Sequence, residues 1–392
     1  MTFVVAGASL AGLRAVESAR RTGYRGRIVL IGAEDRLPYD RPPLSKAFLD
    51  VDGPGEVAPF HPEAVLRDEL GVQLMLGAAA ESLDTAAREV TAGGTAIRYD
   101  ALVIATGAAA RGLPGARTLR TAEDAVAVRT ALDHGARTVV IGAGFIGSEV
   151  ASAARKRGLP VTIVEAQAVP LARAVGEEAG AALAELHLAA GTDLRLATEV
   201  TEVTEVTEVT GVGDGVRLAT GEVLPADLVV AGIGAVPATG WLEGSGLALH
   251  ERDRGVVCDA TLAAGAPGVY AAGDVAHVPN PLFDGEPMRL EHWTNAAEQG
   301  AAAARHALDP ASARALEPVP YFWSDWYGHR IQFVGTPRAD EVVVRGATTL
   351  YRRGDRLAGA LTVDRPREIM KYRRRIAARA PWSEALAFAG AA

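Results

Sequence analysis

The stretch that most constrains this chain is a short apolar strand, residues 139–141, that runs into a helix through the spacing G-x-G-x-x-G. The three glycines are Gly142, Gly144 and Gly147. The first permits a tight turn, the second lets a pyrophosphate approach the backbone, and the third lets the helix pack close to the strand. The N–H groups and the positive dipole end of the helix N-terminus then face the phosphates. The stretch therefore predicts a dinucleotide site.

An acidic residue in the next strand indicates which dinucleotide is bound. That strand, residues 161–164, is followed by Glu165, which lies 23 residues after Gly142. An acid about 20 residues after the first glycine meets the ribose hydroxyls. A carboxylate there accepts from the 2′-OH of NAD and repels the 2′-phosphate of NADP, so Glu165 predicts NAD. The alternative, a glycine-rich turn in a generic parallel sheet, is disfavoured by the order of strand, glycines, helix, strand and acid.

A second copy of this pattern begins the chain. Residues 3–6 form a short apolar strand, and Gly7 and Gly12 frame a turn in which Ser9 replaces the middle glycine. The following strand, residues 27–32, leads to Glu34, which lies 27 residues after Gly7. Two nucleotide folds in one chain predict a flavin that stays bound and a nicotinamide that comes and goes.

Composition restricts the remaining possibilities. Cys258 is the one cysteine of the 392 residues, so we expect neither an internal disulfide nor a cysteine metal cluster, and we predict no metal site. The net charge of −8 argues against general nucleic-acid binding. No apolar run approaches the roughly 18 residues of a membrane span, and no basic region precedes the apolar start. We expect a cytoplasmic protein without membrane contact.

The segments outside the two glycine motifs give further predictions of local structure. Prolines precede a helix capped near Ser45, residues 80–100 alternate as a small hairpin, and residues 169–191 form one helix. Thr121 and Thr294 are expected N-caps, and Cys258 a small apolar strand residue. The repeated Glu-Val-Thr of residues 199–210 favours an extended surface hairpin rather than a site.

The C-terminal segment, residues 318–392, differs from the rest of the chain in its aromatic content and its charge. Aromatic residues cluster at 321–327, strands follow, and a basic helix is expected over 366–379. Residues 318–392 carry a net charge of +6, against −14 for the rest of the chain. A basic tail on an acidic body would suit an acidic partner, although a solvated basic face without a partner is the alternative.

These patterns predict an α/β fold with two Rossmann-like domains and a small C-terminal α+β domain. The expected FAD-binding domain is discontinuous, comprising residues 1–110 and 240–317. Residues 111–239 would bind NAD, and residues 318–392 would form an interface domain.

Taken together, the motifs resemble the FAD-dependent, NADH-using ferredoxin reductases of oxygenase systems, within the glutathione-reductase-like flavoproteins. The resemblance covers essentially the whole chain. It is carried by residues 7–12, 41–46, 105–107, 142–149, Glu165, 270–274, 291–295 and 322–325. Ser9 in place of glycine, and Trp326 where many relatives have glutamine, depart from the family pattern.

The resemblance implies roles for individual residues. FAD would be held by Gly7, Ser9, Ala11, Gly12, Glu34, Arg41, Lys46, Ala80, Thr106, Gly107, Arg120, Asp274, Trp293 and Trp323. NAD would be held by Gly142, Gly144, Phe145, Ile146, Gly147, Glu165 and Gly234. Glu149 beside the nicotinamide, within reach of Lys46 near the flavin N5, would be the catalytic pair.

The implied activity is hydride transfer from NADH to FAD, followed by single-electron transfer to a [2Fe–2S] or other small iron–sulfur ferredoxin. That ferredoxin would serve a cytochrome P450 or a Rieske oxygenase. Two alternatives share the same coenzyme sites. One is a reductase of a small diffusible acceptor such as a quinone, and the other is an NADH-sensing interaction flavoprotein.

Overall fold

The computed structural model describes residues 1–203 and 215–391, which group into two compact units. The first unit comprises Met1–Asp40, Ala58–Ala109 and Val236–Pro318. The second comprises Arg41–Val57, Ala110–Ala235 and Val319–Ala392. The chain crosses between them partly within β8 (Ala108–Ala110) and β16 (Ala235–Pro237), which pair with each other. The assignment of FAD and NAD to particular segments stays a prediction.

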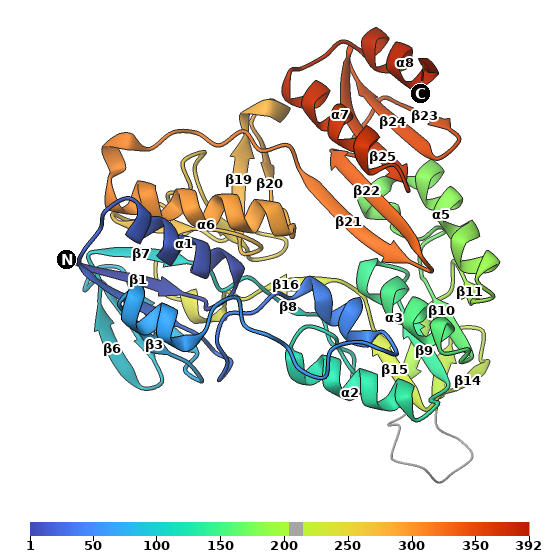
Figure 1. The fold of residues 1–392 in the computed structure, drawn as a ribbon, viewed down its shortest axis with the longest axis horizontal. Helices are drawn as coiled ribbons and strands as arrows, with labels where there is room; N and C mark the ends of the chain where they lie inside the picture. The colour runs from blue at the N-terminus through green and yellow to red at the C-terminus, as the bar shows by residue number, and fades with distance from the viewer. Residues whose placement is uncertain (204–214, 392) are drawn as a thin grey trace. The chain divides into compact units, whose positions relative to one another are not determined.

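The first unit is built on a parallel five-stranded sheet in the order β18-β7-β1-β2-β3. Its strands are β1 (Thr2–Ala6), β2 (Arg27–Ile31), β3 (Val72–Met75), β7 (Ala101–Ile104) and β18 (Val269–Ala271). The inner strands are continuous apolar runs because a parallel sheet is covered on both faces. Helices α1 (Leu10–Arg21) and α6 (Trp293–Leu308) lie side by side against it (Figure 1).

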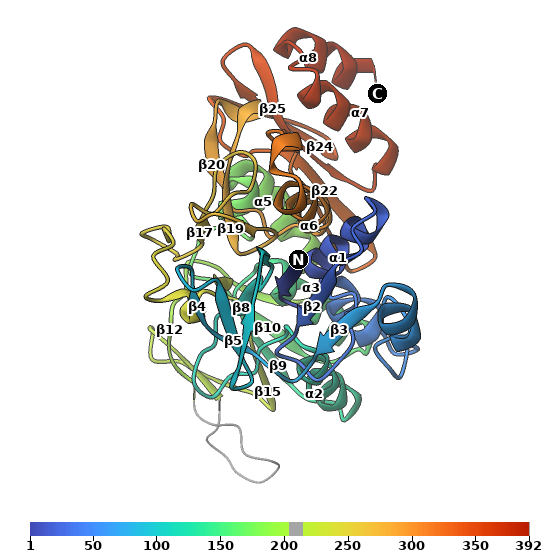
Figure 2. The same ribbon diagram turned by 90° about the vertical axis from the view of Figure 1, so that its left-hand side faces the viewer.

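Smaller elements complete this unit. An antiparallel meander, with β4 and β5 in cyan in Figure 2, precedes β7. The remaining elements are β4 (Ala80–Asp84), β5 (Glu89–Ala92), β6 (Thr95–Arg98), β17 (Val256–Val257), β19 (Ala276–Asn280), β20 (Glu286–Met288), the π-helix Val65–Glu69 and the 3-10 turns Gly240–Leu242, Pro281–Phe283 and Pro310–Ser312.

The second unit holds a second parallel sheet, in the order β11-β10-β9-β15. Its strands are β9 (Thr138–Ile141), β10 (Val161–Val164), β11 (Asp193–Arg195) and β15 (Leu228–Ala231). The associated elements are α2 (Ala122–Asp133), α3 (Phe145–Lys156), α4 (Ala172–Val175), α5 (Glu177–Ala189), an antiparallel sheet of β12 (Val200–Val203), β13 (Gly215–Leu218) and β14 (Val223–Pro225), and the 3-10 turns Pro42–Ser45 and Ala47–Leu49.

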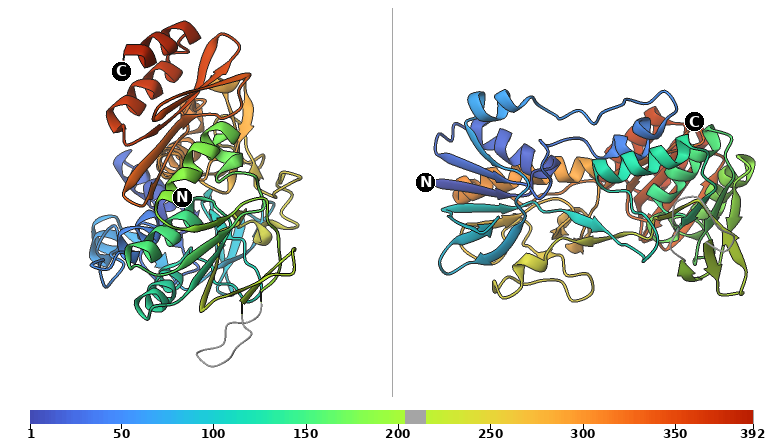
Figure 3. Two further views of the ribbon diagram at one scale, coloured as in Figure 1. Left: turned by 90° about the vertical axis from the view of Figure 1, so that its right-hand side faces the viewer. Right: turned by 90° about the horizontal axis from the view of Figure 1, so that it is seen from below.

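The same unit contains an antiparallel C-terminal sheet in the order β21-β22-β25-β24-β23. Its strands are β21 (Tyr321–Trp326), β22 (His329–Gly335), β23 (Glu341–Arg345), β24 (Thr348–Arg353) and β25 (Arg356–Val363), followed by α7 (Pro366–Ala377) and α8 (Trp382–Ala391). Helix α5 lies against this sheet (Figure 3, left), and Leu183 shares a buried cluster with Phe333 and Tyr351. These features confirm the predicted fold class, two parallel nucleotide-binding-type sheets with a small α+β domain.

Four local expectations are wrong in instructive ways. Residues 80–100 form three strands rather than a hairpin, because Gly93 and Gly94, at φ +53° and +70°, make a second tight turn. The expected helix 169–191 is split at Gly176, whose φ is +80°. Helix α6 begins at Trp293, with His292 rather than Thr294 as its N-cap. Residues 42–49 form 3-10 turns, so Ser45 caps no α-helix.

The remaining local expectations concern Thr121, Cys258 and the hairpin predicted at residues 199–210. Thr121 caps α2 in a capping box with Asp124, as predicted. Cys258 is buried and directly follows β17. Of the expected hairpin at residues 199–210, Val200–Val203 is a strand, and residues 204–210 lie outside the described part of the chain.

Candidate functional site

The glycine turn of the second unit leaves no room for a side chain at its first and third glycines. Gly142 has a φ of +100°, and a Cβ there would lie 2.6 Å from the carbonyl oxygen of Gly232. A Cβ on Gly147 would overlap the carbonyl oxygen of Gly142. Helix α3 starts immediately afterwards, with Gly144 as its N-cap. The turn therefore offers a side-chain-free approach to the helix N-terminus, which fits a pyrophosphate.

Glu165 is hydrogen-bonded to this turn. Its Oε2 accepts a hydrogen bond from the backbone N–H of Ala143 at 2.7 Å, and its Oε1 accepts from that of Gln167 at 2.8 Å. Each ionised carboxylate oxygen has a second acceptor position, so two positions remain for a ribose diol. The structure thus brings Glu165 and the glycine turn together, as predicted from their spacing, and these residues fit an NAD-type dinucleotide.

The turn of the first unit has the same construction. Gly7 has a φ of +124°, and a Cβ there would overlap the carbonyl oxygen of Ala105. A Cβ on Gly12 would overlap the carbonyl oxygen of Gly7. Ser9, the N-cap of α1, has an extended backbone with φ −125°, so this position does not require glycine. The turn therefore fits a dinucleotide such as FAD despite the serine.

Other predicted flavin residues also belong to the first unit. Tyr39 donates to Glu34 at 2.6 Å, and Trp293 Nε1 donates to Asp40 at 2.8 Å. The hydroxyl of Thr106 donates to the carbonyl of Ala238 at 2.8 Å. The structure places ten of the predicted flavin residues in this unit: Gly7, Ser9, Ala11, Gly12, Glu34, Ala80, Thr106, Gly107, Asp274 and Trp293.

The other predicted flavin residues, Arg41, Lys46, Arg120 and Trp323, belong to the second unit. Arg41 Nη1 donates to the carbonyl of Arg120 at 2.7 Å. The guanidinium of Arg330 lies 5.6 Å from the ring centre of Trp323, on the opposite face of β21 from Ser324. Lys46 belongs to the polar cluster around Glu149.

Glu149 is the centre of the most unusual polar cluster in the second unit. It lies on α3, one turn after the glycine turn, and its side chain is 2% exposed. Lys46 Nζ lies 2.9 Å from each carboxylate oxygen. The hydroxyl of Ser45 donates to Oε2, and that of Ser324 donates to Oε1. A carboxylate so deeply buried is tolerated because three donors, one of them charged, replace water.

An aromatic wall adjoins this cluster. Phe145, the first residue of α3, meets Phe322 of β21 edge to face, with ring centroids 4.7 Å apart. Phe322 in turn stacks on Phe333 at 5.1 Å. The C-terminal sheet therefore borders the start of α3, where the predicted nicotinamide pocket lies.

Two residues of the cluster were not identified as functional from the sequence. Ser45 was expected to cap a helix, and Ser324 was expected only as part of a family motif. The alternation of β21 places Ser324 and Trp326 on one buried face, which is a usable signal. Its partner Glu149 is 175 positions away, and no local pattern identifies a contact of that kind.

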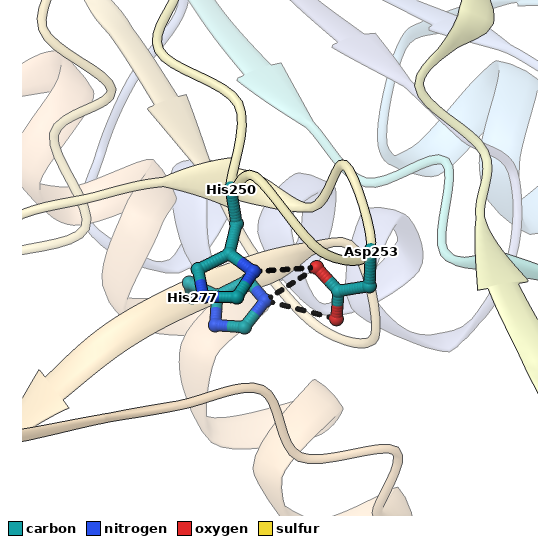
Figure 4. A group of neighbouring side chains, drawn as sticks. All are labelled: His250, Asp253 and His277. Carbon is teal, nitrogen blue, oxygen red and sulfur yellow. Dashed lines mark hydrogen bonds and ion pairs between the residues drawn. The ribbon is translucent and has the colours of Figure 1, made fainter.

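A second polar cluster lies in the first unit, where Figure 4 shows His250, Asp253 and His277. Asp253 accepts from His250 Nδ1 at 3.1 Å, from His277 Nε2 at 2.8 Å and from Arg289 Nε at 2.7 Å. Burial alone would raise the pKa of Asp253, but the hydrogen bonds from Arg289, Gly255 and His277 hold it well below its ordinary value. Burial lowers the pKa of His277, although Asp253 opposes that shift.

These three residues have the composition of a metal site, and two of them are stacked imidazole rings. The rings of His250 and His277 are stacked, with centroids 4.1 Å apart and planes 15° from parallel. Arg289 also donates to the carbonyl of Asp274 at 3.0 Å. The cluster therefore ties the backbone of Asp274 to the loop at Asp253, and the expected absence of a metal site stays a prediction.

Among the helices of residues 1–203 and 215–391, none is both long enough and apolar enough to cross a bilayer.

The comparisons with known proteins agree with this geometry. Residues 1–300 match the pyridine nucleotide-disulphide oxidoreductases, and residues 321–390 match the reductase C-terminal family. Rhodocoxin reductase of Rhodococcus erythropolis is 37% identical over 97% of this chain and 90% of that protein. The ferredoxin–NAD(+) reductase subunit of the benzene 1,2-dioxygenase system of Pseudomonas putida is 37% identical over 93% of this chain and 89% of that protein.

A solved structure extends the likeness to three dimensions. The covalent putidaredoxin reductase–putidaredoxin complex contains a chain that superposes with a TM-score of 0.89 at 33% identity. The match covers 97% of this chain and 94% of that one. With its two glycine turns, its two acids and its C-terminal sheet, the chain belongs to the pyridine nucleotide-disulphide oxidoreductase family.

Proposed function

We propose that this chain is an FAD-dependent NADH:ferredoxin reductase. One observation carries the proposal. Helix α3 bears a dinucleotide turn at its N-terminus and, one turn later, a buried carboxylate paired with Lys46. Relatives named as rhodocoxin reductase and as a ferredoxin–NAD(+) reductase, matched over nearly the full length, supply the acceptor class.

FAD supplies the redox chemistry in this proposal, since a flavin accepts a hydride and releases electrons singly. A dithiol relay is chemically excluded by the composition, because the chain has one cysteine. Burial raises the pKa of the Cys258 thiol to about 12, so little nucleophilic thiolate forms at neutral pH. Electrons therefore leave the protein without a disulfide intermediate.

The residues of the second unit bind and orient NADH. The glycine turn holds the pyrophosphate, and Glu165 accepts from the ribose hydroxyls and excludes a 2′-phosphate. We assign Glu149 to the nicotinamide end of the dinucleotide, and Lys46, its ion-pair partner, to the neighbourhood of the flavin N5. A carboxylate there favours the positively charged, oxidised ring over the neutral reduced ring, and therefore favours loss of the hydride.

The remaining assignments are part of the same proposal. FAD would occupy residues 1–110 and 240–317, NAD residues 111–239, and residues 318–392 would form the interface domain. The electron acceptor would be a [2Fe–2S] or other small iron–sulfur ferredoxin that serves a cytochrome P450 or a Rieske oxygenase. We also propose a cytoplasmic location, because the coenzyme NADH is produced and recycled inside the cell.

The test is NADH-driven reduction of cytochrome c by the purified flavoprotein, with and without a [2Fe–2S] ferredoxin, at low and high salt. Stimulation by the ferredoxin that fades with salt is expected, because docking of opposite charges is screened. Rapid turnover with small acceptors that no ferredoxin increases would overturn the ferredoxin assignment in favour of a small-acceptor reductase.

A further inference from the structure

A buried tryptophan lies behind the carboxylate of Glu149. Trp326, the last residue of β21, is 0% exposed, and its indole Nε1 lies 2.8 Å from Oγ of Ser324. The Ser324 hydroxyl is hydrogen-bonded to Oε1 of Glu149. Three polar groups therefore form one short chain that leads from the C-terminal sheet to helix α3.

The direction of each hydrogen bond in this chain is fixed by chemistry. An indole N–H can only donate, and a serine hydroxyl carries a single hydrogen. Because Ser324 accepts from Trp326, its own hydrogen is directed to Glu149. Ser45 and Lys46 also donate to the carboxylate. Ser324, Ser45 and Lys46 therefore all donate, and the carboxylate oxygens of Glu149 act only as acceptors toward them.

The indole itself is held in place by close packing. Its ring lies 4.8 Å from the ring of His187 on α5, and it belongs to the buried cluster that includes Phe333 and Tyr351. The backbone N–H of the next residue, Tyr327, donates to the side-chain Oγ of Ser152 on α3 at 2.7 Å. Trp326 is therefore a rigid donor.

We propose that Trp326 is a positioning residue that acts on Glu149 through Ser324, an inference that rests on the proposed function of Glu149 at the nicotinamide. The indole N–H keeps the Ser324 hydroxyl pointed at the carboxylate and so keeps the carboxylate in one orientation. Without it, the hydroxyl can rotate and present a lone pair to Glu149, and the carboxylate loses one of its donors.

The first test uses a spectroscopic readout that does not depend on turnover. The holoprotein is labelled with ¹⁵N-tryptophan, and the indole N–H resonance of Trp326 is identified by its loss in Trp326→Phe. Ser324→Ala and Glu149→Gln are expected to shift that resonance, because both alter the acceptor chain. Tyr351→Phe is the matched control. It removes a hydroxyl that donates to the Val175 carbonyl in the same core, and should leave the resonance in place.

The second test measures flavin bleaching on anaerobic mixing with NADH in a stopped-flow instrument. Trp326→Phe is expected to slow the rate at saturating NADH about 5- to 10-fold, the value of one hydrogen bond, with less than about a twofold change in NADH affinity. Ser324→Ala should slow it about 10- to 100-fold. Ser324→Thr, which keeps the hydroxyl, should restore most of the rate, and Tyr351→Phe should match the wild type.

The decisive comparison is the double variant. If Trp326 acts through Ser324, adding Trp326→Phe to Ser324→Ala slows bleaching no further. An equal fold loss in both backgrounds, or an indole resonance unaffected by Ser324→Ala, would overturn the positioning role while leaving the proposed function intact. A wild-type flavin that NADH does not bleach would instead overturn the proposed function. Ser324→Ala removes only the hydroxyl and keeps the indole, so its effects on the indole resonance and on bleaching keep the proposal testable if Trp326→Phe fails to fold.

Discussion

The buried histidine beside Trp326 gives a quantitative prediction. His187 is 0% exposed, its Nδ1 lies 2.8 Å from the hydroxyl of Tyr327, and its Nε2 lies 3.4 Å from that of Ser148. Burial lowers its pKa from 6.5 to about 4. Between those two pH values the unfolded chain binds a proton at this residue and the folded chain does not. Stability is therefore fully present above pH 6.5 and falls as the pH falls.

The size of this effect follows from linkage. Lowering the pH from 7.5 to 4.5 covers about two pH units of the interval between the unfolded and the folded pKa of His187. Protonation of His187 in the unfolded chain should therefore lower the free energy of unfolding by about 2.5 kcal/mol. His187→Gln cannot bind the proton but keeps an amide for hydrogen bonding. Because all other groups titrate in both proteins, the wild type should lose about 2.5 kcal/mol more than this variant between the two pH values.

Urea unfolding of both holoproteins at pH 7.5 and 4.5, followed by far-UV circular dichroism, measures this difference. His134→Gln is the matched control, since the same substitution at an exposed histidine removes no buried group. If the wild type and His187→Gln lose the same stability within about 0.5 kcal/mol, His187 does not remain neutral in the folded protein, and the reasoning fails.

Three further substitutions test the NAD site and the cluster around Asp253. Glu165→Arg should lower the ratio of kcat/KM for NADH to kcat/KM for NADPH roughly 5- to 150-fold. This factor corresponds to about 1–3 kcal/mol for losing or reversing one charged contact. An unchanged ratio would place Glu165 away from the ribose. Gly147→Ala should weaken NAD+ binding in a spectral titration by at least about tenfold, whereas Gly112→Ala, which meets open space, should not. Asp253→Asn should lower the thermal midpoint at pH 7 by about 2–4 °C. That difference should shrink below about pH 4, where the unfolded aspartate is protonated. A constant difference across this range would show that the charge of Asp253 does not stabilise the fold.

The parts of the site that the sequence predicts are those fixed by short-range backbone geometry. Gly142 and Gly147 could be assigned because a turn of that kind has no space for a Cβ, and Glu165 because one helix separates it from the turn. The fold class follows in the same way from apolar runs that alternate with helices. Such features depend on neighbours within about 25 residues.

The features that the sequence does not predict depend on distant partners or on a single backbone angle. The donors around Glu149 come from Ser45, 104 positions earlier, and from Ser324, 175 positions later. No periodicity within one element reports such a contact. Likewise, the break at Gly176 and the start of α6 at Trp293 are decided by φ values and packing that a propensity pattern does not contain.

The grouping of residues 41–57 with the second unit has a consequence for protein engineering. These residues interrupt the sequence of the first unit, between β2 and β3, yet they cluster with the second unit and supply Ser45 and Lys46 to Glu149. A fragment or chimera cut at the nominal coenzyme-domain borders would carry Glu149 without two of its three donors. Gene shuffling among relatives should therefore recover working hybrids only when residues 41–57 and residues 110–235 are inherited from the same parent.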